Sequence, residues 1–72
     1  MTRMMFVESS MFSELGYDEA HKSLTVRFTR GQLYRYHEVP EHLWLDMQAA
    51  DSMGSYFSKN IRDVYRYEKL EE

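Results

Sequence analysis

The chain contains no cysteine, one proline and three glycines among its 72 residues. Without cysteine, neither disulfide bonds nor thiolate metal ligands are available, so stability has to come from packing, with self-association as a further source. No run approaches the roughly 20 apolar residues that a membrane-spanning helix needs, and the N-terminal residues lack the apolar stretch of a signal peptide. We therefore expect a cytoplasmic protein that does not associate with a membrane.

The sequence also lacks the common signatures of catalysis. It has no glycine-rich phosphate loop, no paired-carboxylate motif and no histidine spacing typical of a metal site. Serine, histidine and aspartate are present, but a catalytic triad depends on geometry and not on the presence of these common residues. We therefore predict that the protein is not an enzyme and that it binds no cofactor or metal.

The composition indicates one small globular domain. Hydrophobic residues make up 43% of the chain and aromatic residues 15%, which favours a packed core over disorder. The formal net charge of −3 is opposite to the basic excess of most nucleic-acid-binding domains, so such binding would need a local basic patch. Residues 1–5 are predicted as a flexible N-terminus, residues 6–67 as a single domain and residues 68–72 as an acidic tail.

The segment from Leu24 to Val39 predicts a β-hairpin around which the rest of the chain is organised. Leu24, Val26 and Phe28 alternate with polar residues, as they do in a strand that is buried on one face. The segment after Gly31 has the same strand-like character. The face that carries Val26 is therefore expected to be the inner face of a sheet.

The length of the hairpin loop determines which residues pair. A two-residue loop would bury an arginine, which is costly without a partner. A three-residue loop at residues 30–32 instead pairs Phe28 with Tyr34 and Val26 with Tyr36, and Gly31 supplies the positive φ that such loops need. We therefore predict the three-residue loop, with both tyrosines facing the core and unable to stack on a ligand.

That register places Arg27 and Arg35 opposite each other on the outer face, where two like charges are mildly destabilising. If Leu15 in a preceding strand pairs with Val26, then Glu14 lies beside Arg27 and compensates the charge. The preceding strand is expected to run from residue 6 to residue 17, with a bulge around residues 13–14.

After the hairpin, Pro40 favours the start of an amphipathic helix over residues 41–50. A second short helix follows, capped by Ser52 or Ser55, with Phe57, Ile61 and Val64 on its inward side. Residues 65–67 form either a short edge strand or an extended tail. The predicted fold class is α+β: a three-stranded antiparallel meander, with a short fourth strand as the alternative to a tail, and two short C-terminal helices packed on one face.

Short motifs follow one another in order along most of the chain: Val7-Glu8-Ser9-Ser10, Leu15-Gly16-Tyr17-Asp18, Leu24-Thr25-Val26-Arg27-Phe28, Gly31, Tyr34-Arg35-Tyr36, Val39-Pro40, Ala50-Asp51-Ser52-Met53-Gly54-Ser55-Tyr56-Phe57, Asn60-Ile61-Arg62 and Tyr65. From about residue 7 to residue 67 the sequence resembles the KTSC domain family. That family comprises free-standing small bacterial or phage proteins and a domain at the C-terminus of some lysyl-tRNA synthetases. The resemblance implies no active site, and it suggests RNA binding because of the fusion to a synthetase.

The second predicted helix is a candidate anion site. Ser55 and Tyr56 lie in its first turn, where backbone N–H groups and the helix dipole attract negative charge, and Lys59 and Arg62 follow on an exposed side. An ordinary capped helix with a solvated basic face needs the same residues, and we favour that interpretation.

The leading functional hypothesis is a small non-catalytic binding module for RNA or another phosphate-bearing partner, because basic and aromatic residues are interleaved in this sequence. The candidate binding residues are Arg27, Arg35, Ser55, Tyr56, Lys59, Arg62, Arg66 and Tyr67. The alternative is a module for protein–protein interaction or homodimerisation that uses exposed aromatic residues such as Trp44 or Tyr67, without nucleic acid.

Overall fold

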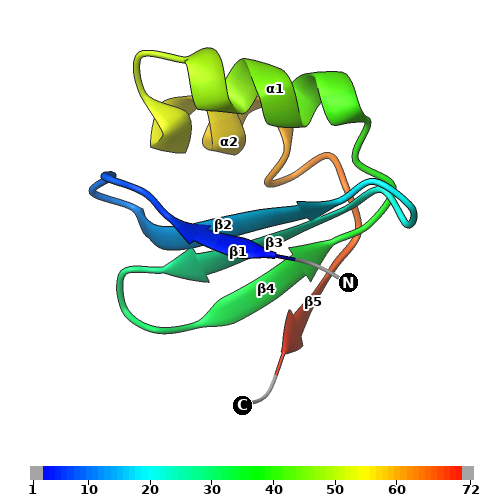
Figure 1. Ribbon diagram of the computed structural model, residues 1–72, viewed down its shortest axis with the longest axis horizontal. Helices are drawn as coiled ribbons and strands as arrows, with labels where there is room; N and C mark the ends of the chain where they lie inside the picture. Colours follow the sequence, from blue (N-terminus) through cyan, green and yellow to red (C-terminus); the bar gives the residue numbers. More distant parts are fainter. Residues whose placement is uncertain (1–2, 71–72) are drawn as a thin grey trace.

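Five β-strands form one antiparallel sheet, and both helices cover the same face of it (Figure 1). The computed structural model describes residues 3–70. Neighbouring strands along the chain are also neighbours in the sheet, so the predicted α+β fold and its meander are confirmed, with five strands in place of the predicted three and a possible fourth. The elements are β1 (Met4–Phe6), β2 (Phe12–Asp18), β3 (Ser23–Phe28), β4 (Leu33–Tyr36), α1 (Glu41–Ala49), α2 (Met53–Asn60) and β5 (Tyr67–Leu70).

The two edge strands extend beyond the strand segments predicted from the sequence, and β5 confirms the short fourth strand that is predicted as the alternative to a tail. Met4 and Met5, predicted as part of a flexible N-terminus, pair with β2 as part of β1. The predicted strand over residues 6–17 is therefore two strands, because the chain reverses direction between β1 and β2. At the other edge, residues 67–70 pair with β4, so most of the predicted acidic tail is strand β5. Residues 1–2 and 71–72 lie outside the described residues.

The register of the central hairpin differs from the prediction by two residues. Val26 lies opposite Tyr34 and Leu24 lies opposite Tyr36, so the predicted pairing of Val26 with Tyr36 is wrong. Because side chains alternate along a strand with a period of two, a shift of two residues leaves every side chain on its predicted face. Both tyrosines therefore still lie on the inner face.

The loop of this hairpin explains the shift. The backbone N–H of Phe28 donates to the carbonyl of Gln32 at 2.9 Å, and that of Gly31 donates back to the carbonyl of Phe28 at 2.8 Å. Phe28 and Gln32 therefore close the turn. The predicted loop of residues 30–32 would instead be closed by Thr29 and Leu33. Gly31 has φ = +101°, as predicted for a glycine in this turn.

The outer-face arginines are consequently not opposite each other. Arg27 faces Leu33 across the hairpin and Arg35 faces Thr25, so the predicted juxtaposition of like charges is absent. The predicted neighbour of Arg27 is confirmed: Glu14 pairs with it across β2 and β3, and its carboxylate accepts a hydrogen bond from Nε at 2.8 Å. The predicted irregularity in β2 is also present, between residues 12 and 14.

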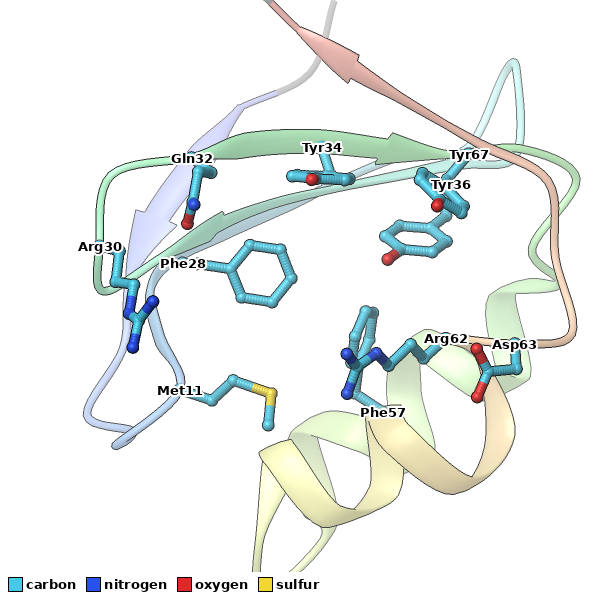
Figure 2. Close-up of a pocket in the computed structure, with 10 residues that line it drawn as sticks. All are labelled: Met11, Phe28, Arg30, Gln32, Tyr34, Tyr36, Phe57, Arg62, Asp63 and Tyr67. Atoms are coloured by element: carbon cyan, nitrogen blue, oxygen red, sulfur yellow. The ribbon is translucent and has the colours of Figure 1, made fainter.

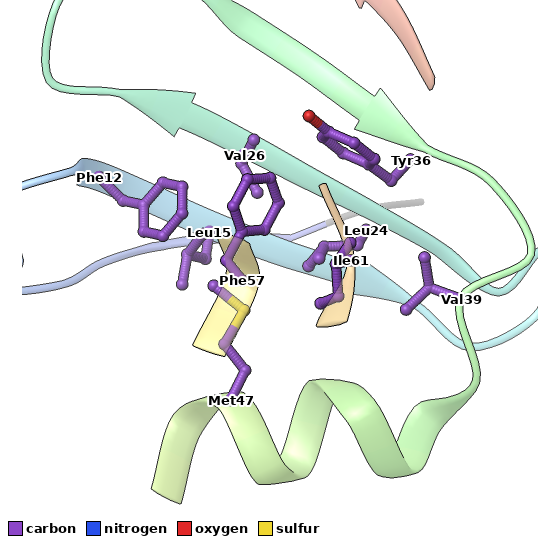
Figure 3. Packing of buried hydrophobic residues seen from close by; sticks show 9 residues of the cluster. All are labelled: Phe12, Leu15, Leu24, Val26, Tyr36, Val39, Met47, Phe57 and Ile61. Carbon is purple, nitrogen blue, oxygen red and sulfur yellow. The ribbon is translucent and has the colours of Figure 1, made fainter. Parts of the chain in front are cut away.

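Nine buried apolar side chains form the core between the sheet and the two helices (Figure 3). The sheet contributes most of them, α1 contributes Met47 and α2 contributes Phe57. The cluster consists of Phe12, Leu15, Leu24, Val26, Tyr36, Val39, Met47, Phe57 and Ile61. Neither helix within residues 3–70 is both long and apolar enough to cross a membrane.

One predicted core residue lies outside this cluster. Phe57 and Ile61 are fully buried, as predicted, but Val64 is 64% exposed. The helix ends at Asn60, so the helical spacing that would place Val64 on the same face does not continue. The prediction of an inward Val64 is therefore wrong.

The uncovered face of the sheet contains a buried hydroxyl without a partner. Thr25 is 4% exposed, and its Oγ1 makes no hydrogen bond within residues 3–70. We expect Thr25→Val to raise the free energy of unfolding by about 1 kcal/mol, because valine keeps the side-chain shape and removes an unpaired polar group. Urea unfolding measures the difference. Thr29→Val, at an exposed position, should change stability by no more than about 0.5 kcal/mol, and a less stable Thr25→Val variant would contradict the expectation.

Candidate binding cleft

A cleft of about 630 Å³ opens on the helix-bearing side of the sheet, between β4 and β5 on one side and α2 with the segment after it on the other (Figure 2). It lies beside the core, at a part of the inner face that the two helices leave open. Its lining residues are Met11, Phe28, Arg30, Gln32, Tyr34, Tyr36, Phe57, Arg62, Asp63 and Tyr67.

Three tyrosines form the strand-side wall of the cleft. The ring of Tyr67 on β5 packs against the rings of Tyr34 and Tyr36 on β4, with centroid distances of 5.5 and 5.3 Å. Tyr67 is 54% exposed and Tyr34 is half-buried. The prediction that an inward-facing Tyr34 is unavailable to a ligand is therefore wrong, because the helices leave the inner face partly open at Tyr34.

Two phenylalanines connect this wall to the core. The ring of Phe57 meets that of Tyr36 edge to face at 5.1 Å, and the ring of Phe28 meets that of Tyr34 at 5.5 Å. The two phenylalanine rings are themselves 6.1 Å apart. Because each ring packs against neighbouring rings, we expect ligand binding to cost little further side-chain entropy on this surface.

The hydroxyl of Tyr36 points into the cleft (Figure 2). Tyr36 is 3% exposed, and its hydroxyl makes no hydrogen bond within residues 3–70. Burial, together with the neighbouring Tyr67, raises the pKa of Tyr36 to about 12, although the positive charge of Arg62 opposes this shift. The group therefore stays protonated at neutral pH and is available to donate a hydrogen bond to a ligand.

The charged groups of the cleft carry a local positive excess. Arg30 and Arg62 line it together with one carboxylate, that of Asp63. Neither arginine forms an ion pair with any residue from 3 to 70. This local excess is opposite in sign to the net charge of the chain, which is −3. The cleft is thus suited to a ligand that combines a negative charge with a flat ring.

No three His, Asp or Glu side chains in the described part of the chain could hold a metal ion.

Two of the predicted binding residues, Arg62 and Tyr67, meet in this cleft. Arg27 and Arg35 belong to the opposite face of the sheet, as predicted. Arg66 is exposed just before β5, and its carbonyl accepts a backbone hydrogen bond from His37 at 2.8 Å. The predicted set is therefore distributed over several surfaces.

The remaining predicted residues belong to α2 and are not among those that line the cleft. The N–H of Ser55 donates to the hydroxyl of Ser52 at 3.2 Å, which makes Ser52 the N-cap, one of the two caps predicted. The hydroxyl of Tyr56 lies 3.5 Å from the carboxylate of Asp46, which acts against an anion at that point. Lys59 is exposed near the end of the helix.

Sequence reasoning missed several residues of the cleft. Arg30 was treated as a turn residue, and Tyr34 and Tyr36 as core. The signal that could have found them is the combination of an arginine in the turn with the Tyr-Arg-Tyr motif on the following strand. Asp63 has no such signal, because its place depends on where α2 ends.

Aromatic exposure also bears on the predicted protein-interaction surface. The indole of Trp44 stacks on the ring of Tyr17, with centroids 5.9 Å apart and an interplanar angle of 12°. Trp44 is half-buried as a result. Phe6, at 84% exposed on the edge strand β1, and Tyr67 present more ring surface to solvent.

Comparison with known proteins identifies small proteins of nearly the same length. The family model of the KTSC domain matches residues 8–65. A protein of Tsukamurella paurometabola is 40% identical over 63 residues, which cover 88% of this chain and 94% of that protein. The crystal structure of a KTSC domain protein from Yersinia pestis superposes with a TM-score of 0.92 at 28% identity and covers 99% of this chain and all of that one.

The comparison also identifies much longer proteins. A lysine–tRNA ligase of Nostoc punctiforme is 32% identical over 63 residues, which are 88% of this chain but only 11% of the ligase. A lysine–tRNA ligase of Trichormus variabilis is 35% identical over 63 residues, with the same coverage. A chain of this kind therefore occurs both alone and as a small part of a ligase, and the resemblance found in the sequence is confirmed.

Proposed function

Because this chain belongs to the KTSC domain family, which occurs in small proteins and in lysine–tRNA ligases, we propose that it is a non-catalytic module that binds single-stranded RNA in the cleft. The observation that carries the proposal is that the exposed ring of Tyr67 and the half-buried ring of Tyr34 line one cleft with two guanidinium groups that form no ion pair within residues 3–70. The ligases act on an RNA, which makes RNA the phosphate-bearing partner to test first.

The chemistry of the cleft suits an unpaired nucleotide. Bases of single-stranded RNA stack on aromatic side chains, and each stacked base contributes about 1–3 kcal/mol. Tyr34 and Tyr67 offer such rings, while Arg62 offers a charge-assisted hydrogen bond to a phosphate. The hydroxyl of Tyr36 adds a donor at the buried end of the site. Single-stranded RNA satisfies all of these groups together.

The opposite face of the sheet is less suitable. The guanidinium of Arg27 is engaged by Glu14 at 2.8 Å. Arg35 faces Glu68 across β4 and β5, and that carboxylate also contacts His37 at 2.9 Å. Each arginine of this face thus has a glutamate as a cross-strand neighbour, which disfavours a phosphate chain.

We expect Arg62→Ala to weaken the binding of a short RNA by about tenfold, because it removes a charged hydrogen bond to phosphate. The measurement is fluorescence anisotropy of a labelled octauridine at low ionic strength, with both proteins checked by circular dichroism. Binding by the unmodified protein should fall as salt rises, with a slope of about −0.7 in log–log form for each phosphate contacted.

Arg35→Ala is the matched control, because it removes the same charge from the opposite face. Its affinity for octauridine should stay close to that of the unmodified protein. Loss of binding in Arg35→Ala but not in Arg62→Ala would move the site to the uncovered face. Inorganic polyphosphate that competes as well as RNA of the same charge would show that stacking is not used.

Protein–protein interaction remains the second candidate function. Phe6 and Tyr67 carry the exposed ring surface that it needs, whereas Trp44 is engaged by Tyr17. Failure of octauridine to bind at low salt, together with a protein that co-purifies or a concentration-dependent dimer in light scattering, would favour this candidate over RNA.

A further inference from the structure

A second hollow continues the cleft along the sheet. It has a volume of about 320 Å³ and lies beyond the turn between β3 and β4. Its lining residues are Ser10, Met11, Phe28, Thr29, Arg30 and Gln32, and all but Ser10 and Thr29 also line the cleft. The two hollows are therefore parts of one surface depression, which we call the trough.

Arg30 stands where the two hollows join. It lies in the turn that the backbone hydrogen bonds between Phe28 and Gln32 close, so its backbone position is well defined. Its side chain is exposed and forms no ion pair with residues 3–70. Figure 2 shows the Arg30 guanidinium separated from that of Arg62, with Phe28 and Met11 on its side of the cleft and Phe57 on the other.

We propose that the trough binds an extended strand with one phosphate at Arg62 and a second phosphate at Arg30. This inference rests on the proposed RNA-binding function and specifies its substrate: an oligonucleotide and not a single nucleotide. A site for a mononucleotide would need one cationic centre beside one aromatic surface, whereas the trough has two cations separated by rings, and neither forms an ion pair within residues 3–70. On the Arg30 side of the cleft, the amide of Gln32 offers both donors and an acceptor to a base or a ribose (Figure 2).

The test compares ligands of increasing length by isothermal titration calorimetry: uridine monophosphate, then uridine oligonucleotides of two, four and eight nucleotides. Affinity for the unmodified protein should rise once the ligand is long enough to reach both arginines. Arg30→Ala should weaken binding of the longer ligands by about tenfold and leave uridine monophosphate unchanged. It should also reduce the steepness of the salt dependence by about 0.7, the loss of one phosphate contact on a single strand.

Arg30→Lys and Arg62→Ala serve as comparison variants. Arg30→Lys keeps the charge and should retain the salt dependence, whereas Arg62→Ala should weaken the monophosphate and the longer ligands alike. If Arg62→Ala weakens the octanucleotide and Arg30→Ala does not, the extended site is wrong and the proposed function stands. A monophosphate that binds as tightly as the octanucleotide would also overturn the extended site. No binding at any length would overturn both.

Discussion

Phe57→Ala is expected to lower the free energy of unfolding by about 3–5 kcal/mol, the usual cost of removing a buried aromatic ring. The ring of Phe57 is fully buried and meets those of Phe12 and Tyr36 at 5.1 Å, so alanine would leave a cavity among neighbours that cannot close it. A domain of this size has a total stability of roughly 4–11 kcal/mol. The variant should therefore lose at least roughly a quarter of the stability of the domain, as measured at 25 °C by urea unfolding followed by circular dichroism.

Val64→Ala is the informative control for this prediction. The helical spacing places Val64 on the same stripe as Phe57 and Ile61, but the structure leaves it 64% exposed. Its truncation should change stability by no more than about 0.5 kcal/mol. Ile61→Ala, at a fully buried position, should cost about 2–5 kcal/mol. Equal losses in the two aliphatic variants would mean that α2 extends beyond Asn60.

Tyr34→Ala is expected to weaken the binding of octauridine by roughly 10- to 100-fold, because one stacked base contributes about 1–3 kcal/mol. The ring of Tyr34 is half-buried between those of Phe28 and Tyr67, at 5.5 Å from each, which holds it against rotation. Fluorescence anisotropy on protein shown to be folded by circular dichroism gives the ratio of affinities.

Tyr34→Phe separates the ring from its hydroxyl. It should bind octauridine almost as tightly as the unmodified protein, since phenylalanine offers the same aromatic face. A folded Tyr34→Ala variant with unchanged affinity would exclude stacking at this position. A Tyr34→Phe variant as weak as Tyr34→Ala would instead assign the effect to a hydrogen bond.

The variants of Tyr34 concern a residue whose face is predicted correctly from the sequence but whose surroundings are not. Tyr34 and Tyr36 were assigned to the inner face by alternation, and both lie there. Only Tyr36 is buried, however, because it lies at the end of β4, where Phe57 of α2 packs against it, whereas Tyr34 lies outside the region that the helices cover. Alternation reports which side of a sheet a residue occupies, but it does not report how far the opposing layer extends.

The edge strands show a related limit. Neither Met4–Phe6 nor Tyr67–Leu70 has a regular alternation of apolar and polar residues, and each is short. Their strand conformation comes from backbone hydrogen bonds to β2 and β4, which depend on a partner strand already in place. A sequence pattern based on side chains does not contain that information.

The sequence alone determined several local features of the structure of this protein. The chain itself specifies the faces of the hairpin, the pairing of Glu14 with Arg27, the turn glycine and the first residue of α1 after Pro40, since each depends on neighbours along the chain or on a period of two. Packing decided the rest. The hairpin register, the end of α2 and the arrival of Tyr67 beside Tyr34 follow from how the layers meet, and they bring residues from three separate segments into one cleft. Such a site is set by the distance between elements in space, which no local pattern encodes.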